Sequence, residues 1–169
     1  SINFYDGILK GTTEAIYGSP AAIEDGYVVN DGTENIDEVE YKTKSLKPMD
    51  DFAKVGDIKF NSLQKAIDSI ETEGTIEIIN DASIKSATTV PSNKNITIDL
   101  AGYTLTSTQT ITSNGTLKII DSSENKTGTI INNSVQTLTI PNGGTMIVDN
   151  ANLISSYGSY AISNNGTLT

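Results

Sequence analysis

The sequence contains no cysteine, histidine or tryptophan, and all 11 of its basic residues are lysine. Without cysteine the chain can form neither a disulfide nor a thiolate metal site. Its formal net charge of −10 disfavours binding to a nucleic-acid backbone, which requires a basic surface. We therefore expect no nucleic-acid partner.

Long apolar runs and aromatic side chains are also scarce. No apolar run approaches the roughly 20 residues that a membrane-spanning helix needs, and only 6% of the residues are aromatic. Hydrophobic residues make up 36% of the chain, with isoleucine by far the commonest, while threonine, serine, asparagine and glycine fill much of the rest. This composition is typical of many short strands joined by polar turns around a thin core.

One motif recurs along the chain: asparagine, one or two glycines, threonine, and then an apolar strand. It occupies residues 114–121 (NGTLKIID) and 142–149 (NGGTMIVD), and it begins again at 165–169 (NGTLT). Residues 2–7 (INFYDG) resemble the missing end of the third copy. A residue that tolerates positive φ, followed by a β-branched residue, predicts a tight corner and a new strand.

The period of the predicted strands indicates stacked coils rather than a sandwich. Four main strands are predicted at 75–79, 95–100, 116–120 and 145–148, with shorter ones at 103–106, 129–131 and 137–140. The first apolar residues of the main strands are Ile76, Ile96, Leu117 and Met146. The steps between these residues are 20, 21 and 29, and the longest step contains a polar insertion at 122–127.

Turn and helix patterns divide the chain into four segments. Residues 1–26 are predicted to be terminal coils of a β-helix, continuing from the C-terminus of a preceding unit. Residues 27–52 are predicted to be a strand-containing spacer or cap. Residues 53–73 should form a hairpin and a helix near 62–72, which begins at Ser62 and covers the open end of the stack. Residues 74–169 should form the β-helix coils.

Three stretches together resemble the opening of right-handed parallel β-helix (pectate-lyase-like) modules, which recur in large surface proteins of Gram-positive bacteria. They are 60–68 (FNSLQKAID), 74–79 (GTIEII) and 96–105 (ITIDLAGYTL). The resemblance covers about residues 53–169 and, more weakly, 1–26. It implies an all-β, right-handed parallel β-helix and an extracellular or cell-surface location. The fold hosts lyases, hydrolases, adhesins and fibre proteins alike, so it does not decide the function.

The enzymes of this fold use residues that this chain lacks. Pectate lyases use bound Ca²⁺ with an arginine as base, and their polygalacturonase-like relatives use clustered aspartates with a histidine nearby. The sequence has neither arginine nor histidine. Because two carboxylates suffice for some glycosidases, a polysaccharide lyase or hydrolase stays an alternative, but we expect no enzymatic activity.

Two sets of residues are candidates for ligand binding. An aromatic platform for a sugar could be formed by Tyr103, Tyr157 and Tyr160. Aspartates that follow the apolar strands could bridge a Ca²⁺ ion, namely Asp99, Asp121 and Asp149, with Asp6 at the other terminus. Capping of turns explains these aspartates better than a metal site does. We therefore expect no cofactor, with Ca²⁺ as the alternative.

The interrupted third motif predicts an assembly interface made of Ser1, Ile2, Phe4, Leu168 and Thr169. On this interpretation the protein is a structural repeat or subunit of an extracellular bacterial filament or surface stalk. Copies would join head to tail through their β-helix ends, either as a covalent tandem or as a non-covalent polymer. The alternative is a glycan- or host-binding adhesin module.

Overall fold

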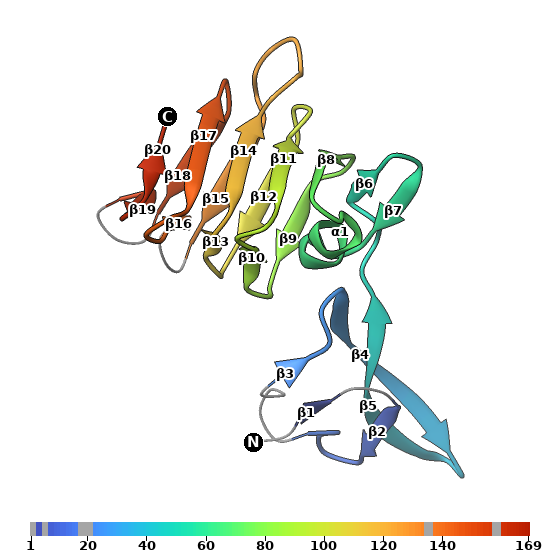
Figure 1. Ribbon diagram of the computed structural model, residues 1–169. Coiled ribbons are helices and arrows are strands. Elements are labelled where there is room, and N and C mark those ends of the chain that lie inside the picture. Colours follow the sequence, from blue (N-terminus) through green and yellow to red (C-terminus); the bar gives the residue numbers. More distant parts are fainter. Residues whose placement is uncertain (1–2, 5–6, 17–21, 134–136, 157–159) are drawn as a thin grey trace. The chain divides into compact units, whose positions relative to one another are not determined.

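The computed structural model describes residues 3–4, 7–16, 22–133, 137–156 and 160–169 (Figure 1). The chain forms two compact units, Ser1–Asp50 and Asp51–Thr169, which are the N-terminal unit and the solenoid unit. In the part of the chain that the structure describes, no helix combines the length and the apolar character needed to cross a membrane.

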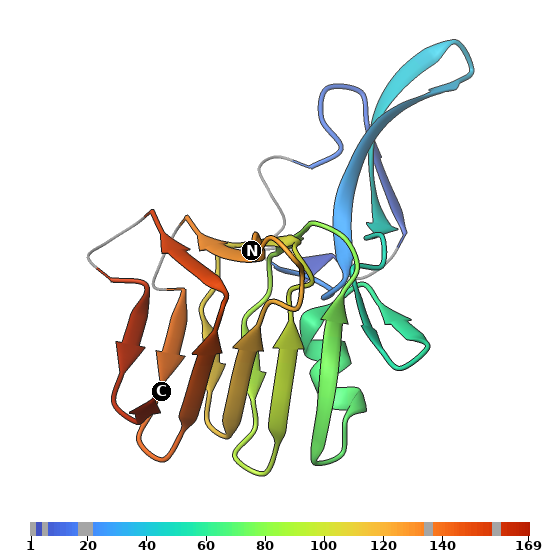
Figure 2. The same cartoon turned by 90° about the horizontal axis from the view of Figure 1, so that it is seen from above.

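The solenoid unit is a stack of about four coils whose strands form three sheets (Figure 1, Figure 2). The first sheet contains β8 (Glu73–Ile78), β11 (Asn95–Asp99), β14 (Thr116–Ile120), β17 (Thr145–Asp149) and β20 (Thr167–Leu168). The second contains β9 (Ala82–Ile84), β12 (Thr104–Ser107), β15 (Thr129–Asn132) and β18 (Asn152–Ser155). The third contains β10 (Thr88–Val90), β13 (Ile111–Ser113), β16 (Leu138–Ile140) and β19 (Ile162–Asn164). Successive coils pair in parallel, which confirms the predicted all-β solenoid.

Alternating side chains along each strand build the core of the stack. In β14, Leu117 and Ile119 are fully buried, whereas Lys118 points outward and is half-buried. This is the period-two pattern of a strand with one face toward the interior. Because the strands pair in register, Leu117 lies between Ile96 and Met146, and similar apolar rows run along the whole stack.

The observed register corrects two sequence predictions. Ile76 pairs with Ile98 rather than with Ile96, so the first step in this sheet is 22 residues (76 to 98) and not 20. The strands β9, β10, β13, β18 and β19 were not predicted, and three of them belong to the third sheet. Strands of three or four residues contain few alternations, so the sequence pattern identified β12, β15 and β16 but missed these five.

Glycine is needed at the repeated corner mainly because successive coils pack closely there, and not because the backbone requires a positive φ. A Cβ on Gly115 would collide with the carbonyl oxygens of Pro91 and Lys94 in the preceding coil. Gly144 and Gly166 are equally close to the backbone of the coil before them. In this motif only Gly143 has a positive φ, at 88°. The prediction that these corners need positive φ is therefore wrong for Gly115, where only the absence of a side chain lets two coils touch.

One end of the stack is covered by the chain's own residues. The hairpin of β6 (Ala53–Val55) and β7 (Ile58–Phe60) pairs antiparallel with the outer edge of β8. The helix α1 (Leu63–Ser69) buries Leu63, Ala66 and Ile67. Its Gln64 side chain accepts a hydrogen bond from Thr89 N at 2.7 Å and donates one to Thr89 O at 3.2 Å. The amide thus occupies the edge of β10 as a neighbouring strand would.

The helix is shorter than the predicted span of 62–72. Ser62 is the N-cap, as predicted, and its hydroxyl accepts a hydrogen bond from Lys65 N at 3.1 Å. The backbone becomes extended at Ile70, and Glu73–Gly74 begins β8 instead of ending the helix. Pairing with β11 at Asn95 supplies more backbone hydrogen bonds to this segment than another helical turn would.

The N-terminal unit has a different sheet. β1 (Asn3–Phe4) pairs in parallel with β3 (Ala22–Ile23). The strands β2 (Ile8–Gly11), β5 (Val39–Pro48) and β4 (Tyr27–Ile36) form an antiparallel sheet in that order. β4 and β5 are joined by Asp37 and Glu38, both with positive φ, in a two-residue hairpin turn.

This sheet crosses the predicted boundary between residues 26 and 27. Within one chain, Ile8–Gly11 pairs antiparallel with residues 42–45 and is not part of a parallel coil. An ion pair of 2.8 Å between Lys10 and Glu34 spans the sheet. The alternation in residues 8–11 is compatible with either partner, so the sequence pattern did not reveal this pairing.

The Gly115 corner generates the first testable prediction. Replacing Gly115 with alanine should lower the free energy of unfolding by about 3 kcal/mol, because the new methyl group must displace backbone of the preceding coil. Gly143→Ala is the matched control: no atom lies within 4 Å of the position that its methyl group would take, so only strain from its positive φ remains, about 1 kcal/mol. Urea unfolding of both variants measures the difference. Equal losses in the two variants would contradict the close-packing explanation.

Candidate functional site

Asp121 is the most constrained of the candidate side chains. It is 2% exposed and lies where the chain leaves β14 for the loop that returns at Gly128. Its Oδ1 accepts hydrogen bonds from Gly102 N at 2.9 Å and Ser123 N at 3.0 Å, and its Oδ2 accepts one from Gly128 N. The carboxylate therefore ties the ends of the loop to the corner of the preceding coil.

The surroundings of Asp121 lower the pKa of its carboxyl group. Burial raises the pKa, but the nearby Ser123 hydroxyl and the backbone amides of Gly128, Ser123 and Gly102 favour the charged form and outweigh burial. The buried Ser123 Oγ has no partner that satisfies hydrogen-bond geometry, so we ascribe most of the lowering to the three amides. The negative charge is a structural component of this corner.

The other two aspartates of the proposed Ca²⁺ site lie apart from each other. Asp99 Oδ1 accepts hydrogen bonds from Ala101 N at 3.0 Å and Ser122 N at 2.9 Å, whereas Asp149 Oδ1 accepts one from Asn150 Nδ2 at 2.6 Å. Asp99 and Asp149 pair with Ile120 from opposite sides, so two strand spacings of about 4.8 Å separate them. Asp6 lies outside the described residues. Among the residues that are described, no three acidic side chains converge as a metal site would require.

The tyrosines do not form one platform. Tyr103 is 37% exposed and lies at the corner between β11 and β12, whereas Tyr160 is 52% exposed and lies at the corner between β18 and β19. These are different corners of the coil, and one coil lies between the coils of the two tyrosines. Tyr157 lies outside the described residues. A sugar could contact Tyr160 without contacting Tyr103.

The residues of the predicted assembly interface are only partly described. Leu168 is 42% exposed in β20, and Thr169 N donates a hydrogen bond to Met146 O at 2.9 Å. Phe4 belongs to β1, whereas Ser1 and Ile2 lie outside the described residues. Leu168 thus continues the apolar row of Leu117 and Met146, but with much of its side chain in contact with solvent.

The end of the stack opposite α1 is a candidate interaction surface, of which the sequence indicated only Leu168 and Thr169. In both views α1 lies at one end of the row of strands and β20 at the other (Figure 1, Figure 2). β18, β19 and β20 are the last strands of their sheets, and among the described residues no strand pairs with their outer edges. Leu105 and Ile130 in the second sheet are fully buried, whereas Leu153 in β18 is half-buried. In the described part of the chain, this surface thus presents strand edges with no further strand beside them, together with partly exposed apolar side chains.

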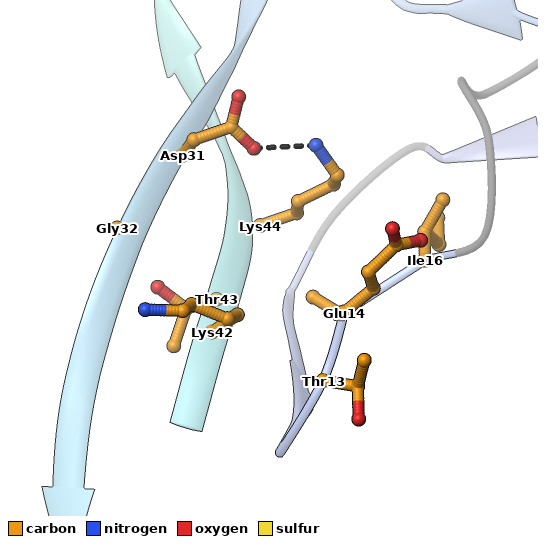
Figure 3. A pocket seen from close by; sticks show the side chains of 9 residues that line it. Thr13, Glu14, Ile16, Asp31, Gly32, Lys42, Thr43 and Lys44 are labelled. Carbon is orange, nitrogen blue, oxygen red and sulfur yellow. Dashed lines mark hydrogen bonds and ion pairs between the residues drawn. The ribbon is translucent and has the colours of Figure 1, made fainter. Parts of the chain in front are cut away.

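A pocket of about 460 Å³ lies in the N-terminal unit (Figure 3). Lys44 Nζ and Asp31 Oδ1 form an ion pair of 2.5 Å at its wall, and Thr13, Glu14 and Ile16 face it from the neighbouring segment. The Asp31 side chain is 72% exposed, so solvent screens this ion pair strongly. The mixture of charges and hydroxyl groups indicates no particular ligand.

Comparisons with protein-family models, with curated proteins and with solved structures found no match to this chain. What is established for this chain is its fold, a β-solenoid of about four coils, which follows from the pairing of its strands.

Asp121 generates the second prediction. An asparagine there would turn an amide donor toward one of the three N–H groups, so Asp121→Asn should destabilise the protein by about 2–3 kcal/mol. Asp149→Asn, at an exposed position, should change stability by less than about 0.5 kcal/mol. Thermal unfolding at neutral pH measures both, and a neutral Asp121→Asn change would contradict the role of the carboxylate.

The pH dependence follows from the lowered pKa of Asp121. The unfolded state binds the proton more readily, so the stabilisation is complete above about pH 4 and is lost as the pH falls through the lower folded-state pKa. The stability difference between the native protein and Asp121→Asn should therefore shrink as the pH falls below about 4, relative to neutral pH.

Proposed function

We propose that the protein is a structural module of an extracellular bacterial filament or surface stalk. The observation that carries the proposal is the difference between the two ends of the solenoid unit. A hairpin, a helix and the Gln64 amide cover one end, whereas at the other end no strand of the described part of the chain pairs with the outer edges of β18, β19 and β20, and Leu168 is partly exposed. Exposed strand edges with apolar neighbours favour pairing with further strands.

The architecture suits a load-bearing rod. Backbone groups along the stack are hydrogen-bonded between coils, and each coil contacts only its neighbours, so the length can grow without a change of design. In our proposal the module is of the right-handed parallel β-helix (pectate-lyase-like) type that its sequence resembles, at the surface of a Gram-positive bacterium. Copies join head to tail, with the uncovered end of one copy against the next, either within one polypeptide or as separate subunits.

Association in solution tests this proposal. Sedimentation velocity at increasing concentration should reveal a series of oligomers, and electron microscopy should show rods. Leu168→Lys places a charge in the layer that the next coil must cover, so it should weaken association at least tenfold, about 1.4 kcal/mol or more. Ile58→Lys, on the 66% exposed tip of the hairpin at the covered end, is the control and should leave association unchanged.

The mass of the native polypeptide under denaturing conditions separates the two versions. A value near 17.9 kDa indicates separate subunits, and a large multiple indicates tandem repeats. The proposal fails if the protein is a monodisperse monomer in which the amides of β18 and β20 exchange as slowly as those of β14. That result would mean that the chain's own residues cover both ends.

The second candidate function is a glycan- or host-binding adhesin module, and the 52% exposure of Tyr160 favours it. An exposed aromatic ring offers an apolar face for a sugar. Binding on a glycan array that is lost in Tyr160→Ala and kept in Tyr103→Ala is the expected result. Loss in both variants, or binding in neither protein, would argue against a site at this corner. A stalk can also carry such a site, so the two functions are compatible.

A further inference from the structure

The corner between β16 and β17 is longer than the equivalent corners of the other coils. β13 and β14 are joined by two residues, Asn114 and Gly115. β19 and β20 are joined in the same way by Asn165 and Gly166. Four residues, 141–144 (PNGG), join β16 to β17. The asparagine–glycine pair of this corner therefore lies in a loop that is two residues longer than the loops of the other two pairs.

The longer corner forms a turn that exposes the peptide between Asn142 and Gly143. Gly144 N donates a hydrogen bond to Pro141 O at 3.0 Å, and Gly143 has a φ of 88°, which is the geometry of a type II turn. Asn142 and Gly143 are both exposed, and no atom lies within 4 Å of the position that a Cβ on Gly143 would take. Among the residues that the structure describes, Gly143 N donates no hydrogen bond to the protein.

The other two asparagine–glycine pairs are held in place by the preceding coil or by a neighbouring side chain. Gly115 N donates a hydrogen bond to Val90 O at 3.3 Å, and Gly166 N donates one to Asn164 Oδ1 at 3.0 Å. A Cβ on either glycine would collide with backbone carbonyl oxygens of the preceding coil. Rotation of either peptide would therefore break a hydrogen bond and push one coil against the next.

The chemistry of an asparagine–glycine pair makes this difference consequential. Asparagine is a labile residue, because the backbone nitrogen of the following residue can attack its side-chain carbonyl carbon. Glycine leaves that nitrogen unobstructed, since it has no Cβ, and it lets the backbone rotate into the attacking geometry. The reaction thus requires an accessible nitrogen and room for the peptide to turn, and of the three pairs only Asn142 and Gly143 have both.

We propose that Asn142 is a site of spontaneous deamidation. Gly143 N forms a bond to Asn142 Cγ, the Cγ–Nδ2 bond breaks, and ammonia leaves with the proton that Gly143 N loses through solvent. The product is a cyclic imide. One water molecule then opens the ring, either at Cγ to give aspartate or at the main-chain carbonyl carbon to give isoaspartate. Water is the only co-reactant, and nothing is oxidised or reduced.

The modification would change the surface of the corner. Either product adds one negative charge at an exposed position, and isoaspartate also lengthens the main chain by one carbon. The turn of residues 141–144 projects beyond the shorter corners, so the added carbon lies away from the apolar rows. This inference does not depend on the proposed function.

Peptide mass spectrometry of the whole chain tests the inference. The folded protein is incubated at mildly alkaline pH, and the conversion of each asparagine to the acid is followed over time. Asn142 should convert at least about ten times faster than Asn114 or Asn165, because those corners must first open locally. Gly143→Ala should slow the conversion of Asn142 at least about tenfold, since the added Cβ shields the attacking nitrogen. The methyl group has room at this position, so the variant should fold.

The same incubation in concentrated urea is the control. All three asparagines precede glycine, so in the unfolded chain they should convert at rates within about threefold of one another. Conversion of Asn142 no faster than Asn114 in the folded protein would overturn the inference. A rate difference that persists unchanged in urea would also overturn it, because the local sequence and not the turn would then set the rate.

Discussion

Parallel backbone pairing between successive coils is the constraint on which the rest of this structure depends. An inner strand such as β14 pairs with a strand on each of its two edges, so an inner coil needs a neighbour above and below. The corners of successive coils must therefore also lie close together. Glycine at positions 115 and 144 permits this, because a side chain at either position would collide with the preceding coil. The apolar rows of Ile, Leu and Met are a consequence of the register and fill the space that the three sheets enclose.

The same constraint makes the ends of the stack its most informative parts. Gln64 shows how one end is managed, since its amide provides the hydrogen bonds of a missing strand to Thr89. Among the described residues, no strand pairs with the outer edge of β18. In the filament that we propose, pairing through unlike ends would generate a line rather than a closed ring.

The polar residues at the corners have a structural role, although their sequence pattern is also typical of a binding site. Asp99 and Asp121 follow strands at similar positions, as ligands of a bridging cation would, yet each carboxylate accepts hydrogen bonds from backbone amides of its own corner and of the neighbouring coil. Asp149 lies two coils from Asp99. The charge of Asp121 is buried and satisfied, which explains both its lowered pKa and its importance for the loop that follows β14.

The sequence by itself determined the solenoid, the β14 and β17 strands and the residues of the apolar rows, because alternation and the repeated Asn-Gly-Thr corner depend on neighbours along the chain. Only the tertiary structure decided the pairing of Ile76 with Ile98, the third sheet and the contact of Gln64 with Thr89. These features depend on residues about 20 positions away in the next coil, and a short strand carries no record of its partner. The same is true of Ile8–Gly11: its alternation suits a parallel coil, but its pairing within one chain is antiparallel.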